Sequence, residues 1–413
     1  SKLDAPSESV RLWVERKRNG WKEDGTGSVR EGEAFPDHVD HFSRAFEDDY
    51  RMGTIPVDLA DSLAELALGS PAVCAARALK RVAPSLEYDD PVLMSSAAMV
   101  ANGFRSLFNN PDSQLLLRGV IEKDVPLWRA ALLYSIDGNL QSVLDEYAHV
   151  LKESLGLFDH DDPEVAVQVA EAMFEALSIR VSNLTVDEFT DDPETGGVKK
   201  RDFRIRCRYA LRFSDIKDDT ESNLIRAGTV RQAFNSPFKP FVLASTSIGQ
   251  EGLDFHTYCH SVWHWNLPSN PVDLEQREGR VHRYKGHAVR KNIADRFGLD
   301  LLRELWDGAG DPWKLLFEEA VRRRPDLMND IYPYWIFEDS DHPSKIERTV
   351  PMLPCSKEES RLVRLKQSLA LYRLAFGQPR QEDLLEFLAR DSEDDMSEFR
   401  ISLQPECETE GME

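Results

Sequence analysis

The period of the hydrophobic residues changes once along this chain, near residue 200, and this change limits the folds that the chain can form. In residues 139–156 (NLQSVLDEYAHVLKESLG), apolar side chains recur every three or four positions, which places them on one face of a helix. From Phe203 to Leu211 they alternate with arginines, which is the period of a strand with one buried face. We therefore predict a helical region first and strands after it.

The first 186 residues are predicted to form a mainly α-helical region. Similar apolar stripes occur in residues 57–69, 72–82 and 163–179. In residues 139–156, Asn139 is the expected N-cap and Gly156 the expected C-terminal stop. The acids, proline and paired glycines of residues 187–202 predict a linker or exposed loop.

Residues 200–300 are predicted to form one α/β domain. The alternating strand is followed by a helical segment (222–234) and by the continuous apolar run FKPFVLAST (238–246), which is typical of a parallel strand buried on both faces. A further apolar run at 262–265 extends the predicted parallel sheet. Strand, crossover helix and strand make a βαβ unit, so we expect helices to flank the sheet.

Residues 301–390 are predicted to form a helical C-terminal extension. An apolar stripe marks a helix that Gly377 and Pro379 end, and it consists of Leu362, Leu365, Leu369, Tyr372 and Phe376. From residue 381 to the end, twelve acids face two arginines. Residues 391–413 are therefore predicted to be a solvated acidic tail.

Charge is distributed unevenly along the 413 residues, whose net charge is −22. This total argues against a protein that coats nucleic acid, but residues 276–296 hold seven Lys and Arg against two acids. The sequence has no apolar run of membrane-spanning length and no signal-peptide core near its N-terminus, which predicts a cytoplasmic location. The five cysteines are scattered, without the spacing of a disulfide framework or zinc knuckle, so no metal site is predicted.

Two segments carry residues suited to chemistry on phosphates. STSIGQEGLDF (245–255) offers hydroxyls, then glycines that let backbone approach a ligand, then Asp254. QREGRVHR (276–283) spaces Gln276, Arg280 and Arg283 at i, i+4 and i+7, on one face if the segment is helical. Guanidinium groups suit phosphate oxygens, and they stabilise the charge that develops on a transferring phosphoryl group.

In this order and spacing, the two segments resemble motifs V and VI of superfamily 2 helicases and translocases. The second RecA-like domain of that family carries a Ser/Thr-rich loop ending in an EGLD-type turn and then Q-R-x-G-R-x-x-R, which residues 276–283 match at every defining position. The intervening HWNLPSNPVDLEQ resembles the remodeller-like branch. The resemblance covers roughly residues 200–295, and it implies a RecA-like sheet there and a helicase accessory region or insertion before it.

The resemblance also implies roles for individual residues. Arg280 and Arg283 would reach the ATP phosphates as arginine fingers, and Gln276 would orient the nucleotide or the attacking water. Asp254 and Gly252 would face the ribose and phosphates, and Gly279 completes the predicted cofactor-binding set. Ser245 and Thr246 would touch the nucleic-acid backbone.

The chain lacks the sequence signals of a first RecA-like domain. It contains no Gly-Lys dipeptide and hence no phosphate-binding loop, and the nearest imitation of a Walker B motif, residues 145–149 (DEYAH), is predicted to be helix surface. ATP and Mg²⁺ are therefore expected to bind mainly to a first RecA-like domain in the same full-length chain or in a separate subunit. Because the chain begins at Ser1, we expect the C-terminal part of a longer helicase or the second half of a split one.

Several residues leave two interpretations open. The arginines of the alternating strand either track a phosphate backbone or form the outer face of an edge strand, and they are Arg204, Arg206, Arg208 and Arg212. His256, Cys259, His260 and His264 suggest zinc by composition, but their side chains are expected to splay. Trp263 and Trp265 are predicted to be core residues, not base-stacking platforms. Residues 284–287 (YKGH) are expected to form a turn.

The sequence therefore predicts the C-terminal motor half of an ATP-dependent DNA helicase or translocase that tracks double-stranded DNA. The resemblance suggests a bacterial setting in defence against phage or in DNA repair. Further protein partners are expected through the helical region. The alternative is a non-catalytic RecA-like scaffold that uses the helical region to bind partners, and the complete set Gln276, Arg280 and Arg283 favours the motor.

Overall fold

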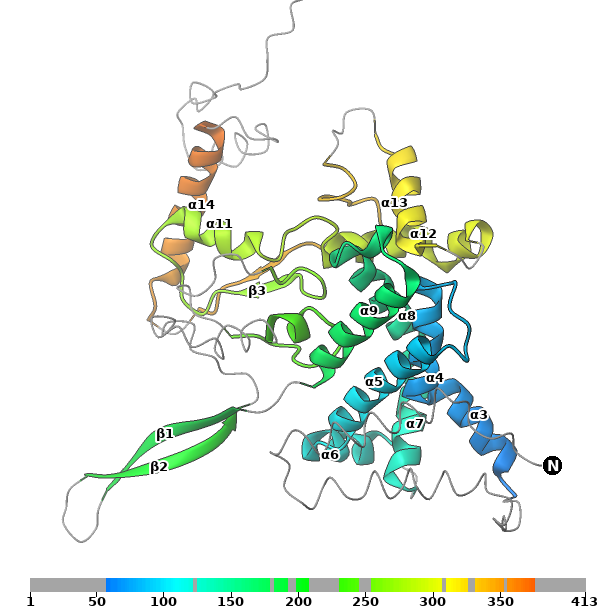
Figure 1. Cartoon of the computed structure of the whole chain (residues 1–413). Helices are drawn as coiled ribbons and strands as arrows, with labels where there is room; N and C mark the ends of the chain where they lie inside the picture. The colour runs from blue at the N-terminus through cyan, green and yellow to red at the C-terminus, as the bar shows by residue number, and fades with distance from the viewer. Residues whose placement is uncertain are drawn as a thin grey trace, which may run out of the picture. The chain divides into compact units, whose positions relative to one another are not determined.

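The structure is a computed structural model that describes residues 57–121, 125–178, 182–191, 198–207, 230–244, 254–306, 310–325, 331–352 and 355–375. Most of them are helical, and a small two-stranded parallel sheet accompanies the helices (Figure 1). The chain divides into two compact units, one of Ser1–Gly249 with Phe297–Glu319 and one of Gln250–Arg296 with Ala320–Glu413.

The first unit contains a run of α-helices joined by short connections. They are α3 (Leu59–Gly69), α4 (Pro71–Val82), α5 (Pro91–Phe108), α6 (Pro111–Val120), α7 (Leu127–Asp137), α8 (Leu140–Ser154) and α9 (Asp162–Leu177), with a 3₁₀ turn η1 (Leu157–Asp159) before α9. Side-chain caps begin α5 and α9, as well as α8: Asp90 accepts the Val92 N–H at 2.7 Å and Asp161 accepts the Glu164 N–H at 3.1 Å. A proline in the first turn of both α5 and α9 adds a fixed φ.

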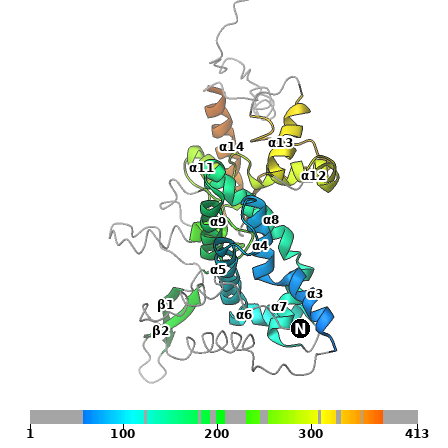
Figure 2. The ribbon, with the colours of Figure 1, turned by 45° about the vertical axis from the view of Figure 1, so that its right-hand side comes forward.

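The core of this unit lies where α4, α5, α8 and α9 pack side by side (Figure 2). Their facing residues are almost fully buried, among them Leu79, Leu93, Leu144, Val169 and Met173. At one crossing, α5 approaches α9 closely, since a Cβ on Gly103 would lie 2.9 Å from the Leu177 Cβ. Helical amphipathicity in the sequence thus becomes a shared apolar interior.

The prediction for residues 139–156 is confirmed. The Asn139 side chain accepts the Ser142 N–H, α8 ends at Ser154, and Gly156 follows with φ +70°. The DEYAH residues lie in this helix as expected, but Tyr147 and His149 are buried, so the prediction of helix surface is wrong for them. Tyr147 belongs to the apolar stripe that faces the core, whereas His149, two positions later, lies on the opposite side of α8, where its Nδ1 is 3.9 Å from Asp311 Oδ1.

Adding a methyl group at Gly103 should destabilise the helical unit. Gly103→Ala places its Cβ against the Leu177 Cβ, which cannot rotate away, so we expect the free energy of unfolding to fall by about 1–3 kcal/mol. Gly119→Ala in α6 is the control, because its Cβ would meet nothing within 4 Å and should stabilise the helix by up to about 1 kcal/mol. Urea unfolding followed by circular dichroism measures both, and equal effects would contradict the close approach.

Among the described residues, no single helix is both long and apolar enough to cross a membrane. Only α3 and α4 taken together pass that test, and they are bent by 44° at the break between them.

The linker prediction for residues 187–202 is wrong in most of its length. β1 (Ser182–Asp191) and β2 (Val198–Cys207) form an antiparallel pair, with Glu188 opposite Arg201 and Thr185 opposite Arg204 (Figure 1). The alternating segment therefore belongs to a hairpin and not to a parallel sheet, and its residues beyond Cys207 lie outside the described part. The backbone pairing of residues 182–191 with 198–207 is a long-range feature that composition alone did not indicate.

The apolar run that begins at Phe238 is not a strand between Phe238 and Ala244. Phe238 packs edge-on against Phe104 and Tyr147, with ring centroids 5.3 and 5.8 Å apart, and so belongs to the helical core. Pro240 cannot donate to a ladder, and Phe241 and Val242 are 74% and 82% exposed. The predicted buried parallel strand is wrong here because Phe238 is buried by helices.

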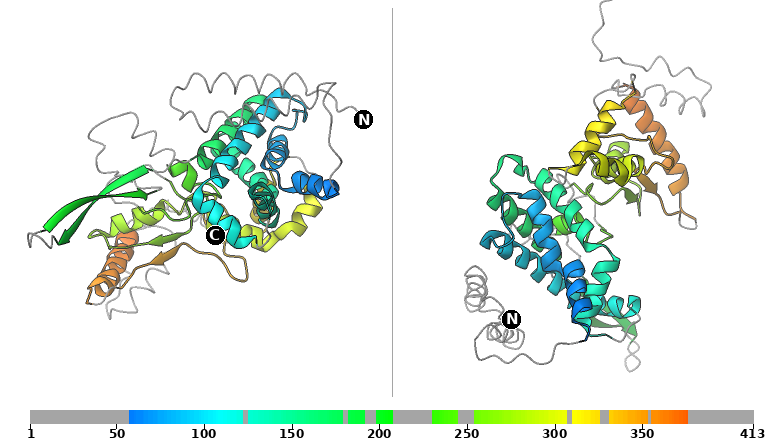
Figure 3. Two further views of the ribbon diagram at one scale, coloured as in Figure 1. Left: turned by 90° about the horizontal axis from the view of Figure 1, so that it is seen from below. Right: turned by 90° about the vertical axis from the view of Figure 1, so that its right-hand side faces the viewer.

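The second unit contains the parallel pair of β3 (Ser261–Trp263) and β4 (Glu347–Thr349), together with α11 (Pro271–Gly279) and α14 (Glu358–Ala375). α11 packs on α14 (Figure 3) through a cluster of Leu267, Leu274 and Leu365, with Val350 and Leu362 beside it. The helix predicted from the stripe at Leu362 is confirmed as α14, and its predicted stop lies outside the described residues.

Two further helices, α12 (His287–Leu305) and α13 (Pro312–Arg322), contain residues of both units. α12 bends at Gly298, whose φ of +61° and ψ of −170° glycine adopts readily.

Candidate functional site

The basic segment predicted to bind phosphates is placed by α11. The helix begins at a side-chain cap, because Asn270 accepts the Val272 N–H at 2.9 Å, and Pro271 fixes its first φ. Leu274 is fully buried and orients the helix, whereas Gln276 is exposed. α11 ends at Gly279, and Arg280 caps it with φ −75° and ψ −24°.

The expected single helical face is therefore only partly formed. Gln276 lies within α11 and Arg280 at its end, but Arg283 lies beyond the helix, in the following turn. The Glu278 carbonyl accepts two N–H groups at 2.9 Å, from Val281 in a tight 3₁₀-type bond and from His282, so the last turn of the helix tightens at this point. This turn, and not a continuous helix, determines where Arg283 lies.

The same turn brings the two predicted motifs together. Arg283 Nε donates to Asp254 Oδ1 at 2.8 Å, and the Phe255 N–H donates to the Arg280 carbonyl at 2.9 Å. Both side chains of the ion pair are partly exposed, 43% for Arg283 and 46% for Asp254. The last residues of the first motif therefore lie against the arginines of the second, in a place that solvent and a ligand can reach.

Residues 284–287 form a turn, as predicted. Lys285 has φ +49° and donates its N–H to the Tyr334 carbonyl at 2.8 Å, and the Gly286 N–H donates to the Arg283 carbonyl at 3.0 Å. Tyr284 stacks on Tyr334 with ring centroids 5.4 Å apart. This turn leads directly into α12 and fixes the C-terminal side of the arginine segment.

Some predicted site residues lie outside the described part of the chain. These are Ser245, Thr246, Gly252, Arg208 and Arg212. Arg204 and Arg206 lie in β2, opposite Thr185 and Asn183 of β1. Gly279 is the last residue of α11, and a Cβ there would meet nothing within 4 Å, so the space beside it is open.

The histidines considered for zinc separate into two groups. His260 Nδ1 lies 2.9 Å from His287 Nδ1, while His264 Nε2 lies 3.1 Å from Glu278 Oε1. Burial lowers the pKa of His287 to about 4, and the nearby His260, Arg290 and Lys291 act in the same direction. Within the described ranges, no group of three or more His, Cys, Asp or Glu residues is arranged like metal ligands.

The prediction that Trp263 and Trp265 are core residues is wrong. Trp263 is 69% and Trp265 is 76% exposed, whereas His264 between them is 2% exposed. Extended backbone alternates its side chains between two faces, and in this segment the alternation buries the histidine against Glu278.

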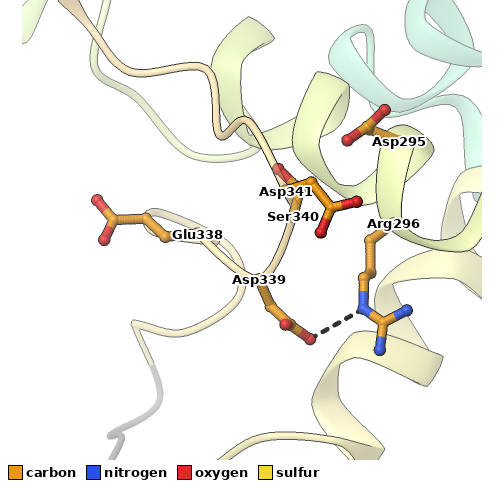
Figure 4. Close-up of a pocket in the computed structure, with 6 residues that line it drawn as sticks. All are labelled: Asp295, Arg296, Glu338, Asp339, Ser340 and Asp341. Atoms are coloured by element: carbon orange, nitrogen blue, oxygen red, sulfur yellow. Dashed lines mark hydrogen bonds and ion pairs between the residues drawn. The ribbon is translucent and has the colours of Figure 1, made fainter.

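The cavity in Figure 4 does not suit a phosphate. It measures about 370 Å³ and is lined by Asp295, Arg296, Glu338, Asp339, Ser340 and Asp341. Arg296 donates to Asp339 at 3.1 Å, so the one guanidinium in this lining is already paired with a carboxylate. Four carboxylates would repel a nucleotide, so this cavity is not a candidate phosphate site.

The sequence did not predict the polar groups that hold the end of α11 through Glu278. Glu278 is enclosed by His264 and by Arg348 of β4, which donates to both carboxylate oxygens. Arg348 lies 70 residues after Glu278, and no local pattern links the two.

Comparison with protein families assigns part of this region. Residues 224–285 match the model of the helicase conserved C-terminal domain. This part of the chain is similar to helicase C-terminal domains. The match supports a helicase C-terminal domain of the superfamily 1 and 2 type, and it includes Asp254 and the arginine turn. No curated protein and no solved structure is significantly similar to the chain.

Proposed function

We propose that this chain supplies the second RecA-like domain of an ATP-dependent helicase or translocase. The observation that carries the proposal is the junction of Asp254 with Arg283 and of Phe255 with Arg280, inside the helicase C-terminal segment. Two guanidinium groups in one turn are suited to an anion whose charge grows during phosphoryl transfer. The parallel strand β3, followed by α11 and this turn, supports a RecA-like arrangement of residues 254–283, whereas residues 198–207 lie in an antiparallel hairpin and residues 238–244 form no strand.

In this proposal, ATP and Mg²⁺ are held mainly by a first RecA-like domain, and this chain contributes groups to the phosphates. The Arg283 guanidinium carries five N–H donors, of which the Nε–H contacts Asp254. Asp254 would hold Arg283 in place until the phosphates arrive and would face the ribose side together with Gly252. Gln276, exposed on α11, would orient the nucleotide or the attacking water.

The nucleic-acid track is assigned to Ser245 and Thr246, with Arg204, Arg206 and Arg208 as a second candidate. Net charge −22 requires such a track to be local, because most of the surface would repel phosphates. Duplex DNA as the substrate, the remodeller-like branch and a role in phage defence or repair rest on the motif resemblance alone.

ATP hydrolysis by the isolated chain and by the complete motor tests this function. The purified 413-residue chain should hydrolyse no ATP above background, because its sequence has no phosphate-binding loop. Adding the first RecA-like domain, fused or as a separate subunit, should restore turnover that nucleic acid stimulates. Turnover by the isolated chain at a rate typical of helicases would contradict the proposal.

One observation favours the alternative of a partner-binding scaffold. α3 carries Leu59, Leu63 and Leu66 at i, i+4 and i+7, and they are 38%, 55% and 40% exposed. An exposed apolar stripe of this kind is typical of a docking helix. Leu63→Glu should abolish a scaffold's partner binding, whereas Arg283→Ala should leave it intact, and a motor should respond in the opposite way.

A further inference from the structure

Glu278, in the last turn of α11, has a carboxylate that two other segments enclose. Its side chain is 17% exposed, and His264 Nε2 lies 3.1 Å from Oε1. Arg348 donates with Nε to Oε1 and with Nη2 to Oε2 at 2.6 Å, which is a two-point grip on both oxygens. An ionised carboxylate only accepts, so His264 carries its proton on Nε2.

The backbone of the same residue supports the arginine turn. The Glu278 carbonyl accepts the N–H groups of Val281 and His282, both at 2.9 Å. The two donors lie between Arg280 and Arg283, so these bonds fix the backbone that connects the two arginines. A shift of Glu278 therefore moves the residues that are proposed to reach the phosphates.

The charge of Glu278 depends on its partners. Burial by itself raises the pKa of Glu278, but the hydrogen bonds from Arg348 and His264 outweigh it and hold the pKa at about 2. The carboxylate is therefore ionised near neutral pH. An ionised group in this position needs a cation beside it, because water reaches little of it.

α14 fixes the preceding turn of α11. Arg373 Nη2 donates to Glu275 Oε1 at 2.6 Å, and Leu365 packs in the cluster that contains Leu274. Both Arg348 and Arg373 lie C-terminal to residues 224–285, which match the helicase domain. The chain after that segment therefore holds α11 from two sides.

We propose that Arg348 is a positioning residue for the arginine turn and acts through Glu278. Its guanidinium contacts Glu278, and it keeps the end of α11 in the place that directs Arg280 and Arg283. Its effect on ATP turnover rests on the proposed function, whereas its effect on the turn does not.

Hydrogen exchange in the full chain tests the effect on the turn. Arg348→Met removes the guanidinium but keeps most of the side-chain length, and the amides of Val281 and His282 should exchange about tenfold faster as this turn opens locally. Arg364→Met, an exposed residue of α14, is the matched control and should leave exchange unchanged. Amides of α5 and α9 report global unfolding and should not change. Unaltered exchange at 281–282 would overturn the proposal.

A second substitution tests the route through Glu278. In Arg348→Met the carboxylate is left enclosed with only His264, so Glu278→Gln in the same chain should restore part of the protection. Arg348→Lys should give partial protection, since it keeps the charge but not the two-point grip. If the amides of Val281 and His282 exchange as fast in the double variant as in Arg348→Met, Arg348 does not act through Glu278, and the proposal is overturned.

In the complete motor, Arg348→Met should lower kcat about tenfold and leave the KM for ATP within about twofold, because nucleotide binding belongs mainly to the other domain. Without its guanidinium partner the pKa of Glu278 rises, so the acid limb of the kcat profile should move to higher pH. An unchanged acid limb would argue against positioning by charge. If the unaltered motor hydrolyses no ATP while exchange still responds, the proposed function fails and the positioning role of Arg348 stands.

Discussion

Arg280→Ala or Arg283→Ala lowers ATP turnover by the complete motor about 10³-fold or more, the scale on which arginine fingers act. The two residues bracket a turn whose backbone is fixed at both ends, by the Phe255 N–H and by the Gly286 N–H. Their guanidinium groups would meet the phosphate charge only as it develops, so kcat should fall far more than the affinity for nucleic acid. Steady-state ATPase assays and DNA-binding titrations measure the two effects.

Lysine should not replace either arginine. A flexible ammonium group cannot make the forked contact with two oxygens, so Arg280→Lys should remain close to the alanine variant. Arg277→Ala is the matched control, because Arg277 lies on α11 but its Nη1 donates to the Asn266 carbonyl at 2.8 Å, outside the helix. Full turnover in Arg280→Lys, or an equal loss in Arg277→Ala, would count against the assigned role.

The helices could be predicted from the sequence because their signals are local. The stripe from Leu140 to Leu151, the cap at Asn139 and the stop at Gly156 all lie within one helix and agree with one another. The run at Phe238 was wrongly predicted to be a buried strand, because Phe238 is buried by Phe104 and Tyr147, which lie far earlier in the sequence. The hairpin was missed because acids, proline and glycines in 187–202 obscured the cross-strand pairs.

The candidate site was predictable where the two motifs follow each other in order. The resemblance implied that Asp254 and the arginines all face the nucleotide, and the structure places Asp254 Oδ1 2.8 Å from Arg283 Nε. The i, i+4, i+7 spacing predicted one continuous helical face, but α11 ends at Gly279, a residue of low helix propensity. Glu278 and Arg348 were not predictable, because a half-buried ion pair between distant segments leaves no periodic trace in the sequence.

Replacing Arg204 and Arg206 together should weaken nucleic-acid binding by the complete motor and flatten its dependence on salt. The register of the hairpin places both on one face of β2, opposite Asn183 and Thr185, while Phe203 and Ile205 fall on the other face. If both contact phosphates, the slope of log affinity against log salt should fall by about two, since each contact contributes roughly 0.9. Fluorescence anisotropy with duplex DNA at several salt concentrations measures the slope.

Arg201 supplies the control for this experiment. It lies in the same strand but at an alternate position to Arg204 and Arg206, and the register sets it opposite Glu188. Arg201→Ala should therefore leave the slope unchanged. If the Arg204 and Arg206 substitutions also leave it unchanged, these arginines form the outer face of a hairpin, and the phosphate contacts belong to Ser245 and Thr246. A slope that falls equally in all variants would indicate a general loss of positive charge and no defined track.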